Sequence, residues 1–407
     1  MVNERPIVLD YTKTTCWMIN LLPFEGEDRA DWELVHGFQM ACKSSKVFGI
    51  GWHLSELRLG NLTEESYEDF LAAYEEEDSS LNNALCSMSK IKPGDYIITR
   101  LRDSHYYIGR INSPIKYNDN ENVPSEEYGK ILSWYGEVEH WAEFENDEVF
   151  PSELVGRFSR CYQKTIELVE PIRQRVLAIQ AYHERLGLEK PFDSMIRISD
   201  KNLALSLSYS DLEDLVAAYI FSKNPGYMLM PSSCKLSHIK YEFTFVKDGE
   251  KPLTCQVKNQ ADLPPIGEYI NETSYKKIYL YSGMYSNEQV YELRDKYNNY
   301  SQLEFISSSD LYAFFRNQGC EYMRHKLERF YQMNYEESNF DKVLKSCGYA
   351  ETASFRSPKN KYKYINGDYY IDGWDLRYSE DLNAFVVNGD LDKYHKTISL
   401  LTEEMCK

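Results

Sequence analysis

Short apolar runs separated by polar turns mark the N-terminal part of the chain. The runs 16–22 and 47–52 are almost wholly apolar, and each predicts a buried strand. Residues 92–101 and 106–111 alternate between apolar and polar positions, and the polar residues between them predict a β-hairpin. Apolar residues at helical spacing predict a helix over 63–77. The pattern indicates a strand-rich domain over residues 1–165.

A longer helical pattern separates this region from the middle of the chain. Residues 166–187 predict a helix that ends at Gly187, and we assign 166–200 to a helical linker. From 201 to 320 helices and strands alternate, which is typical of a mixed sheet with flanking helices. The predicted helices are 208–223, 287–297 and 309–318, and the predicted strands are 226–233, 240–246, 253–259, 277–283 and 302–307.

The last part of the chain, 321–407, changes character again. Short helices are predicted over 325–338 and 340–348. Aromatic strands follow, with two Asn-Gly-Asp sequences between them that are typical of hairpin turns. This region predicts a small α+β domain of unassigned role. Its Lys-rich, Tyr-rich hairpin suggests contact with a DNA backbone or, alternatively, a packing element.

Composition and charge narrow the class of protein. The chain has 407 residues, of which 43% are hydrophobic, and its net charge is −18. Its nine cysteines are scattered without zinc-site spacing, and no apolar run is long enough to cross a bilayer. We therefore expect a cytoplasmic, multidomain protein. Residues 1–170 hold 16 Lys and Arg against 31 Asp and Glu, which argues against generic coating of nucleic acid by this part.

Four polar residues of the middle region form a candidate catalytic group. Gln256 and Lys258 are two apart on one predicted strand, so their side chains share a face. A turn through residues 247–251 would bring Glu242 beside them, and Glu213 lies on the preceding helix. Carboxylate and amide oxygens suit Mg²⁺ or Mn²⁺, and a lysine can stabilise charge on a phosphate. The alternative is a cross-strand ion pair on a solvated face.

The order of these residues resembles the Mrr-type branch of the PD-(D/E)xK nucleases. A helix with an internal Glu, then the strand KYEFTFV, then the tripeptide QVK carry the resemblance, over about residues 205–320. It implies a restriction-endonuclease-like α/β domain with a mixed sheet. Glu242, Glu213 and Gln256 would then be the Mg²⁺ or Mn²⁺ ligands, and Lys258 would be the catalytic lysine. Here the principal acid is Glu where the family more often has Asp.

The N-terminal region resembles the PUA-like, EVE-type modules that precede restriction-type nucleases. The resemblance is carried by CWMINLL, FGIGW, KPGDYIITRL with YYIGRI, and HWAEF. It implies a small β-barrel with an aromatic pocket for a flipped base. The residues it assigns to that pocket are Trp17, Ile19, Trp52, Asp95, Tyr107 and Trp134. Strand aromatics are also commonly core residues, so that alternative stays open.

Together these patterns predict an α+β and α/β multidomain protein, with a PUA-like β-barrel module before the nuclease-like domain. The function they favour is a Mg²⁺-dependent DNA endonuclease of modification-dependent restriction or antiviral defence. The resemblance implies a homodimer, with possible partner proteins from a defence operon. Two alternatives remain: an inert nuclease fold that senses nucleic acid or a nucleotide, and an interaction subunit of a defence complex.

Overall fold

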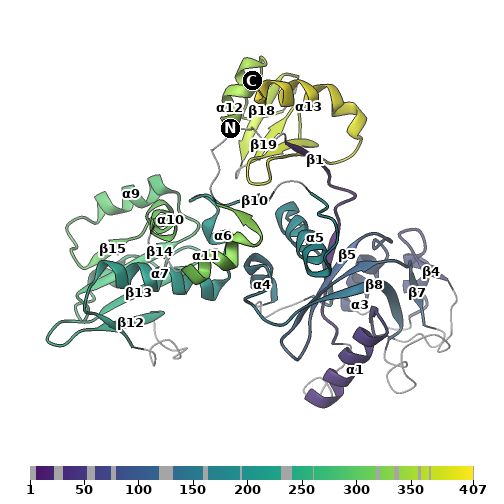
Figure 1. Ribbon diagram of the computed structural model, residues 1–407, viewed down its shortest axis with the longest axis horizontal. Helices are drawn as coiled ribbons and strands as arrows, with labels where there is room; N and C mark the ends of the chain where they lie inside the picture. Colours follow the sequence, from purple (N-terminus) through teal and green to yellow (C-terminus); the bar gives the residue numbers. More distant parts are fainter. Residues whose placement is uncertain are drawn as a thin grey trace. The chain divides into compact units, whose positions relative to one another are not determined.

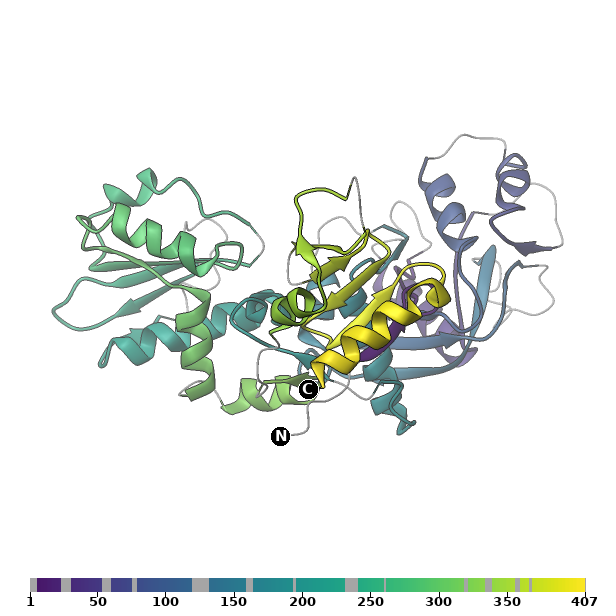
Figure 2. The same cartoon turned by 90° about the horizontal axis from the view of Figure 1, so that it is seen from above.

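The computed structural model is a mixed α/β protein built from several sheets (Figures 1 and 2). It forms two compact units: Met1–Pro151 with Phe158–Ile196 and Tyr335–Lys407, and Ser152–Arg157 with Arg197–Asn334. No helix in the described part of the chain is both long and apolar enough to span a membrane. The described residues are 6–22, 31–52, 60–74, 79–118, 132–158, 164–192, 195–230, 241–259, 261–317, 321–333, 339–355, 359–365 and 368–406.

A strongly curled, half-barrel sheet forms the N-terminal part of the first unit. The strands run in the order β4-β7-β8-β6-β5-β2-β9, and β3 also pairs with β8. The long strand β8 joins the two parts of this sheet. Its first residues pair with β3 and β7, and its later residues pair with β6. The bounds are β2 Cys16–Ile19, β3 Val47–Ile50, β4 Asn61–Leu62, β5 Tyr96–Arg100, β6 Tyr106–Ile111, β7 Ile115–Tyr117, β8 Trp134–Phe144 and β9 Ile166–Leu168.

The sequence predictions for this part are partly confirmed. The strands at 16–22 and 47–52 exist, and β5 and β6 form the predicted antiparallel hairpin. Of the helix predicted over 63–77, residues Tyr67–Leu71 form α2 with Ser66 as the N-cap, and residues 75–77 lie outside the described part of the chain. Helices α1 (Trp32–Ser44), α3 (Ser79–Met88) and α4 (Ser152–Phe158) were not predicted.

The predicted helix 166–187 is wrong at its start and confirmed at its end. Residues Ile166–Leu168 form strand β9, which pairs with β2, and the helix α5 runs from Ile172 to Leu186. The cause is Pro171, which keeps the residue before it extended and favours the start of a helix after it. Gly187 ends the helix in the left-handed conformation, with φ of 64°.

Gly49 lies in β3 directly against the backbone of β8, which leads to a testable prediction. A Cβ at this position would lie 2.2 Å from the Trp134 carbonyl oxygen and 3.0 Å from the Tyr135 Cα. Because both neighbours belong to a paired strand, they cannot move without breaking the ladder. We expect Gly49→Ala to destabilise the protein by about 1–3 kcal/mol or more, measured by chemical denaturation.

The matched control for this prediction is Gly156→Ala in α4. A methyl group there meets no described atom within 4 Å, and Ala is favoured over Gly in a helix. Gly156→Ala should leave stability unchanged or raise it. Equal stability of the two variants would show that β3 and β8 are not in close contact.

The second unit is organised around a five-stranded sheet in the order β11-β12-β13-β14-β15. The first three strands are antiparallel to one another, and the last three are parallel. The predicted alternation of helix and strand is confirmed, with Ser208 capping the first long helix. The elements are α6 Leu203–Ser206, α7 Tyr209–Lys223, β11 Met228–Leu229, β12 Phe243–Val246, β13 Leu253–Lys258, α8 Gly267–Ile270, β14 Lys277–Ser282, α9 Asn287–Lys296, β15 Leu303–Phe305 and α10 Ser308–Asn317.

This unit continues beyond residue 320, where the sequence analysis ended the nuclease-like domain. Helix α11 covers Glu321–Glu328, and residues Tyr331–Gln332 form strand β16, which pairs with β10 (Ile196–Arg197). The helix predicted over 325–338 therefore begins earlier and ends before β16, and residues 334–338 lie outside the described part of the chain. Lys326, the buried lysine of α11, forms an ion pair with Asp211 of α7.

The C-terminal sheet contains a strand from the other end of the chain. Strand β1 (Ile7–Asp10) pairs in parallel with β21 (Ala384–Val387), so it does not belong to the half-barrel as the range 1–165 implied. The order is β1-β21-β20-β19-β18-β17, with α12 (Phe340–Ser346) and α13 (Leu391–Met405) packed on one face. The remaining strands are β17 Ala350–Glu351, β18 Lys361–Ile365, β19 Asp368–Ile371 and β20 Leu376–Ser379.

The two Asn-Gly-Asp sequences have different positions in this sheet. The first, 366–368, lies between β18 and β19, but its first two residues are outside the described part of the chain. The second, 388–390, was wrongly predicted as a hairpin turn. It leads from β21 into the unpredicted helix α13, where the Asp390 side chain accepts a hydrogen bond from the Asp392 backbone N–H.

Candidate active site

The four residues predicted to form a catalytic group come from three elements of the second unit. Glu213 lies in α7, Glu242 immediately precedes β12, and Gln256 lies in β13 with Lys258. Phe243 pairs with Cys255 in the antiparallel ladder, so the same register places Glu242 opposite Gln256. The Glu242 backbone N–H donates to the Cys255 carbonyl oxygen at 3.0 Å, which extends the ladder to the site.

Direct contacts bring the side chains together around the Glu242 carboxylate. The Gln256 Nε2 donates to the Glu242 Oε1 at 2.6 Å. The Lys258 Nζ lies 3.5 Å from the same oxygen, and the two side chains keep 29% and 21% of their surface exposed. The predicted turn through residues 247–251 therefore brings Glu242 beside Gln256 and Lys258, as expected. Solvent can still reach the group.

Glu213 completes the group through electrostatics. Burial raises the pKa of its carboxyl to about 7, and the nearby Glu242 carboxylate contributes to the rise, while Tyr209 and Lys258 act in the opposite direction. Two carboxylates this close repel each other, and the repulsion is relieved by a proton or by a cation between them. A pair of acids with a raised pKa in one of them is typical of functional sites.

Tyr209 belongs to the site and was not predicted from the sequence. Its hydroxyl donates to the Glu242 Oε1 at 3.4 Å and also contacts Glu213. Burial and the charges of Glu242 and Glu213 raise the pKa of Tyr209, so it stays a neutral hydrogen-bond donor. The available signal was the spacing: Tyr209 and Glu213 are four residues apart on one helix, and such residues lie on the same face.

A buried ion pair anchors the start of the helix that carries Tyr209 and Glu213. The Lys326 Nζ lies 3.1 and 2.9 Å from the two carboxylate oxygens of Asp211, and both side chains are largely buried. The Ser208 hydroxyl donates to the same carboxylate at 2.7 Å and accepts from the Asp211 backbone N–H. Helix α11 is therefore anchored to the first turn of α7.

The donor set fits a hydrated divalent cation. In the described residues, no group of three or more His, Cys, Asp or Glu side chains is arranged to hold a metal, so a closed zinc-type site is not among them. The site offers two carboxylates and one amide oxygen instead. Mg²⁺ and Mn²⁺ accept few protein ligands and keep several waters, so this smaller oxygen set suits them.

The residues assigned to a base pocket lie in a different environment. Trp17, Ile19, Tyr107 and Trp134 belong to the core of the half-barrel and expose at most 4% of their surface. Asp95 is also buried, and it accepts from the Trp17 Nε1 at 3.0 Å. These side chains pack the sheet, and a base could stack on them only after rearrangement.

Trp52 is the exception among these residues. It packs against the same core while remaining partly exposed, and its carbonyl oxygen accepts from the Tyr74 hydroxyl at 2.9 Å. Its φ of 83° is unusual for a bulky residue. Residues 53–59, which follow it, lie outside the described part of the chain. The structure therefore does not assemble the six predicted residues into one open pocket, and base recognition stays a prediction.

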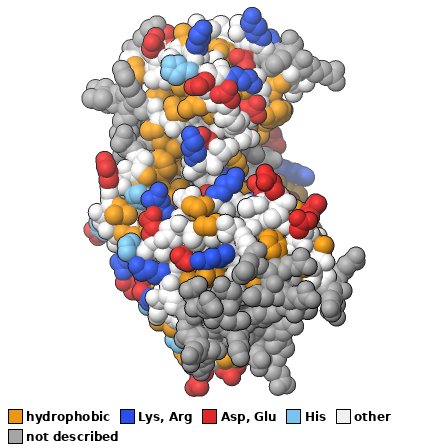
Figure 3. All heavy atoms as spheres, turned by 90° about the vertical axis from the view of Figure 1, so that its right-hand side faces the viewer, with side chains coloured by type: hydrophobic (Ala, Val, Ile, Leu, Met, Phe, Trp, Pro, Cys, Tyr) orange, Lys and Arg blue, Asp and Glu red, His pale blue; other side chains and the backbone are white. Residues whose placement is uncertain are grey.

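A polar network surrounds the hydroxyl of Tyr107 at the end of β6. It donates to Glu143 Oε1 at 3.0 Å and to Asp103 at 3.1 Å, and Lys43 and His105 also contact Glu143. Burial alone would raise the pKa of Glu143, but hydrogen bonds from Lys43, His105 and Tyr107 outweigh it and lower the pKa to about 2. Each of these side chains is therefore hydrogen-bonded within the network. On the face drawn in Figure 3, acidic and basic side chains are interspersed.

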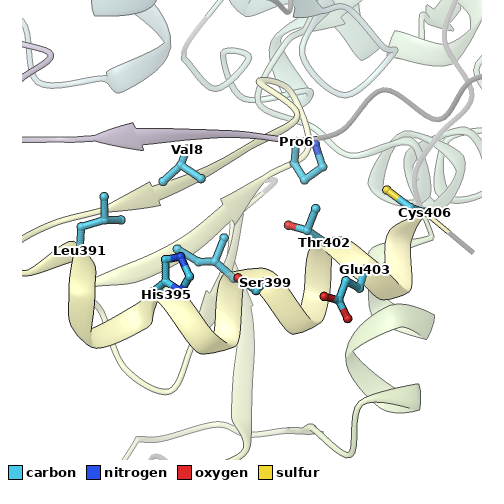
Figure 4. Close-up of a pocket in the computed structure, with 9 residues that line it drawn as sticks. Pro6, Val8, Leu391, His395, Ser399, Thr402, Glu403 and Cys406 are labelled. Carbon is cyan, nitrogen blue, oxygen red and sulfur yellow. The ribbon is translucent and has the colours of Figure 1, made fainter.

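A groove of about 520 Å³ lies between β1 and α13 (Figure 4). Val8 and Pro6 face the helix across it, and both apolar and hydroxyl side chains line it. Among the described residues that line it, Glu403 is the one acidic side chain. The paired carboxylates found in the second unit therefore have no counterpart in this described lining.

Comparison with known proteins assigns neither a family nor a function to the chain. No protein-family model matches the chain, and no curated protein or solved structure is significantly similar to it.

Proposed function

We propose that the second unit is a metal-dependent nuclease domain that hydrolyses the phosphodiester backbone of DNA. The observation that carries the proposal is the contact of Gln256 and Lys258 with the carboxylate of Glu242, to which the Tyr209 hydroxyl links Glu213. Three antiparallel strands continued by two parallel ones, led by a helix with an internal Glu, support a restriction-endonuclease-like fold.

Glu242 and Glu213, with the amide oxygen of Gln256, would hold the cation. When bound, Mg²⁺ supplies Lewis-acid chemistry at the scissile phosphate. The repulsion that helps to raise the pKa of Glu213 gives the site an electrostatic reason to accept a cation. The Gln256 amide now donates to Glu242 through its nitrogen, so metal binding requires it to present its oxygen instead.

Lys258 would act on the substrate rather than on the cation. Its ammonium group is partly exposed and borders the same carboxylate oxygen that Gln256 contacts. From there it can donate hydrogen bonds to a phosphate oxygen or to the attacking water, and so stabilise the negative charge that develops in the transition state. Tyr209 would hold the two carboxylates in position through its hydroxyl group.

We extend the proposal to modification-dependent restriction or a related defence role, with the half-barrel as a PUA-like module. The curled sheet supports that module. The burial of Trp17, Tyr107 and Trp134 means that base recognition would need other surfaces or a rearrangement. Cutting both strands of a duplex would require two copies of the site, so the proposal includes a homodimer.

Incubating the full-length protein with supercoiled plasmid tests the proposal. We expect nicked and linear DNA in the presence of Mg²⁺ or Mn²⁺, and no cleavage when the metal is removed with a chelator. Unmodified and cytosine-modified plasmids should be compared, because a preference for one would support a reader function in the first unit. Absence of cleavage on both, with either metal, would contradict the nuclease proposal and favour an inert nucleic-acid-binding fold.

A further inference from the structure

The C-terminal sheet has two chemically different faces. The face against α12 and α13 is apolar and includes Tyr362, Tyr369, Leu376 and Phe385. Because side chains alternate along a strand, the neighbouring residues Lys363, Tyr370 and Arg377 point to the other face. The ladder pairs Lys363 with Tyr370 and Tyr370 with Arg377, so these three side chains form one row across β18, β19 and β20.

Two further aromatic rings extend this row, Trp374 in the β19–β20 connection and Phe355 in the segment after β17. Trp374 lies 5.2 Å from the Tyr370 ring and 5.2 Å from the Phe355 ring, both measured between centroids. The Lys363 Nζ lies 5.4 Å from the centre of the Trp374 ring, and the Arg377 guanidinium lies 5.8 Å from that of Tyr370. We name these residues, Phe355, Lys363, Tyr370, Trp374 and Arg377, the aromatic–cationic platform.

The indole of the platform is exposed, and yet its loop is held in position. Trp374 keeps 57% of its surface exposed, which is unusual for so large an apolar ring. Its loop is fixed to β18, because the Asp372 backbone N–H donates to the Lys361 carbonyl oxygen and the Asp372 carboxylate accepts from the Lys361 backbone N–H. The indole is therefore preorganised rather than left loose, which lowers the entropic cost of binding a ring against it.

Lysine side chains border the platform in a chain that is strongly acidic overall, together with the carboxylates of Asp368 and Asp372. Lys359, Lys361 and Lys363 form no ion pair with a described residue, whereas Arg377 is paired with Asp368 at 3.0 Å. Lys361 and Lys363 are two apart on β18, so they share the face of the platform. Against a net charge of −18, these lysines beside aromatic rings in edge-to-face contact are complementary to a polyanion that carries planar groups.

We propose that the aromatic–cationic platform binds single-stranded nucleic acid, with a base stacked on Trp374 and phosphates held by Lys361 and Lys363. Bases in a single strand are free to stack on aromatic side chains, whereas those in a duplex are not. The proposal is independent of the nuclease site, because the platform belongs to the other compact unit and needs no metal.

Binding of a fluorescein-labelled oligothymidylate to the full-length protein tests this inference. The assay uses fluorescence anisotropy in a chelator, so nuclease activity does not affect it. Stacking contributes about 1–3 kcal/mol per base, and we therefore expect Trp374→Ala to weaken binding about 5- to 150-fold. Lys361→Gln with Lys363→Gln should reduce the salt dependence of binding by about 1.4 in slope.

Trp32→Ala is the matched control. Trp32 is 52% exposed on α1 and stacks on His36, so it is a comparably exposed indole outside the platform. Its substitution should leave affinity unchanged, and both variants should show the thermal unfolding of the wild type. An oligonucleotide of abasic sites should bind more weakly than oligothymidylate. Equal affinity of Trp374→Ala and wild type, or no binding by wild type, would each overturn the proposal.

Discussion

Replacing Lys258 with Met is expected to reduce metal-dependent DNA cleavage about a hundred- to a thousandfold, with the fold intact. The ammonium group lies 3.5 Å from the Glu242 carboxylate and keeps 29% of its surface exposed, so it is poised to contact a bound phosphate. Methionine retains most of the length of the side chain and removes its charge. The substitution should reduce the rate of the chemical step, measured in single-turnover reactions, by a larger factor than it reduces DNA affinity.

The matched control is Lys277→Met on the adjacent strand β14. Lys277 is also partly exposed and also pairs with a glutamate, Glu304, at 2.5 Å, but it is not among the residues around Glu242. Its substitution should leave cleavage within about twofold of the wild type, because an exposed ion pair of this kind contributes little. Equal losses in both variants would mean that charge on the sheet, rather than a catalytic lysine, supports the activity.

Replacing Lys326 with Met is expected to lower the free energy of unfolding by about 3–5 kcal/mol. The substitution leaves the buried Asp211 carboxylate without its cation, and a buried unpaired charge is costly. Asp211 is in the first turn of α7, which carries Tyr209 and Glu213, so cleavage should fall along with stability. Denaturation monitored by circular dichroism measures the first effect.

The pair formed by Lys345 and Asp341 provides the control, because it joins two exposed residues one helical turn apart in α12. Lys345→Met should cost no more than about 0.5 kcal/mol. In a Lys326→Met, Asp211→Asn double variant, the loss should be smaller than in Lys326→Met alone, since the carboxylate charge is then also removed. A Lys326→Met protein as stable as Lys345→Met would show that α11 does not anchor α7.

The candidate site was largely predictable because its geometry follows from local periodicity. Two residues separated by one on a strand share a face, and this rule alone joins Gln256 to Lys258. The short turn after β12 requires an antiparallel partner, and this places Glu242 beside them. Tyr209 was missed because tyrosine is common in this chain, which has 34, and helical spacing alone did not distinguish it.

The burial of the aromatic residues in the half-barrel could not be predicted from local sequence patterns. Trp17 and Trp134 lie on strands, and periodicity does not determine whether such a ring faces a pocket or a core. The answer depends on which strands lie next to them. The Trp134 ring contacts the rings of Phe70 and Tyr117, and the Trp17 indole donates to Asp95, so both rings are buried against residues distant in sequence.

By itself, the sequence determined the local structure of this protein: the β5–β6 hairpin, the start of α7 at Ser208, the end of α5 at Gly187, and the shared face of Gln256 and Lys258. These features depend on residues within a few positions of one another. The tertiary structure alone decided the pairing of β1 with β21, the anchoring of α7 by Lys326, and the assembly of Phe355, Tyr370 and Trp374 on one sheet face. Each of these depends on contacts between separate elements, whose partners are chosen by the packing of the whole unit rather than by any local pattern.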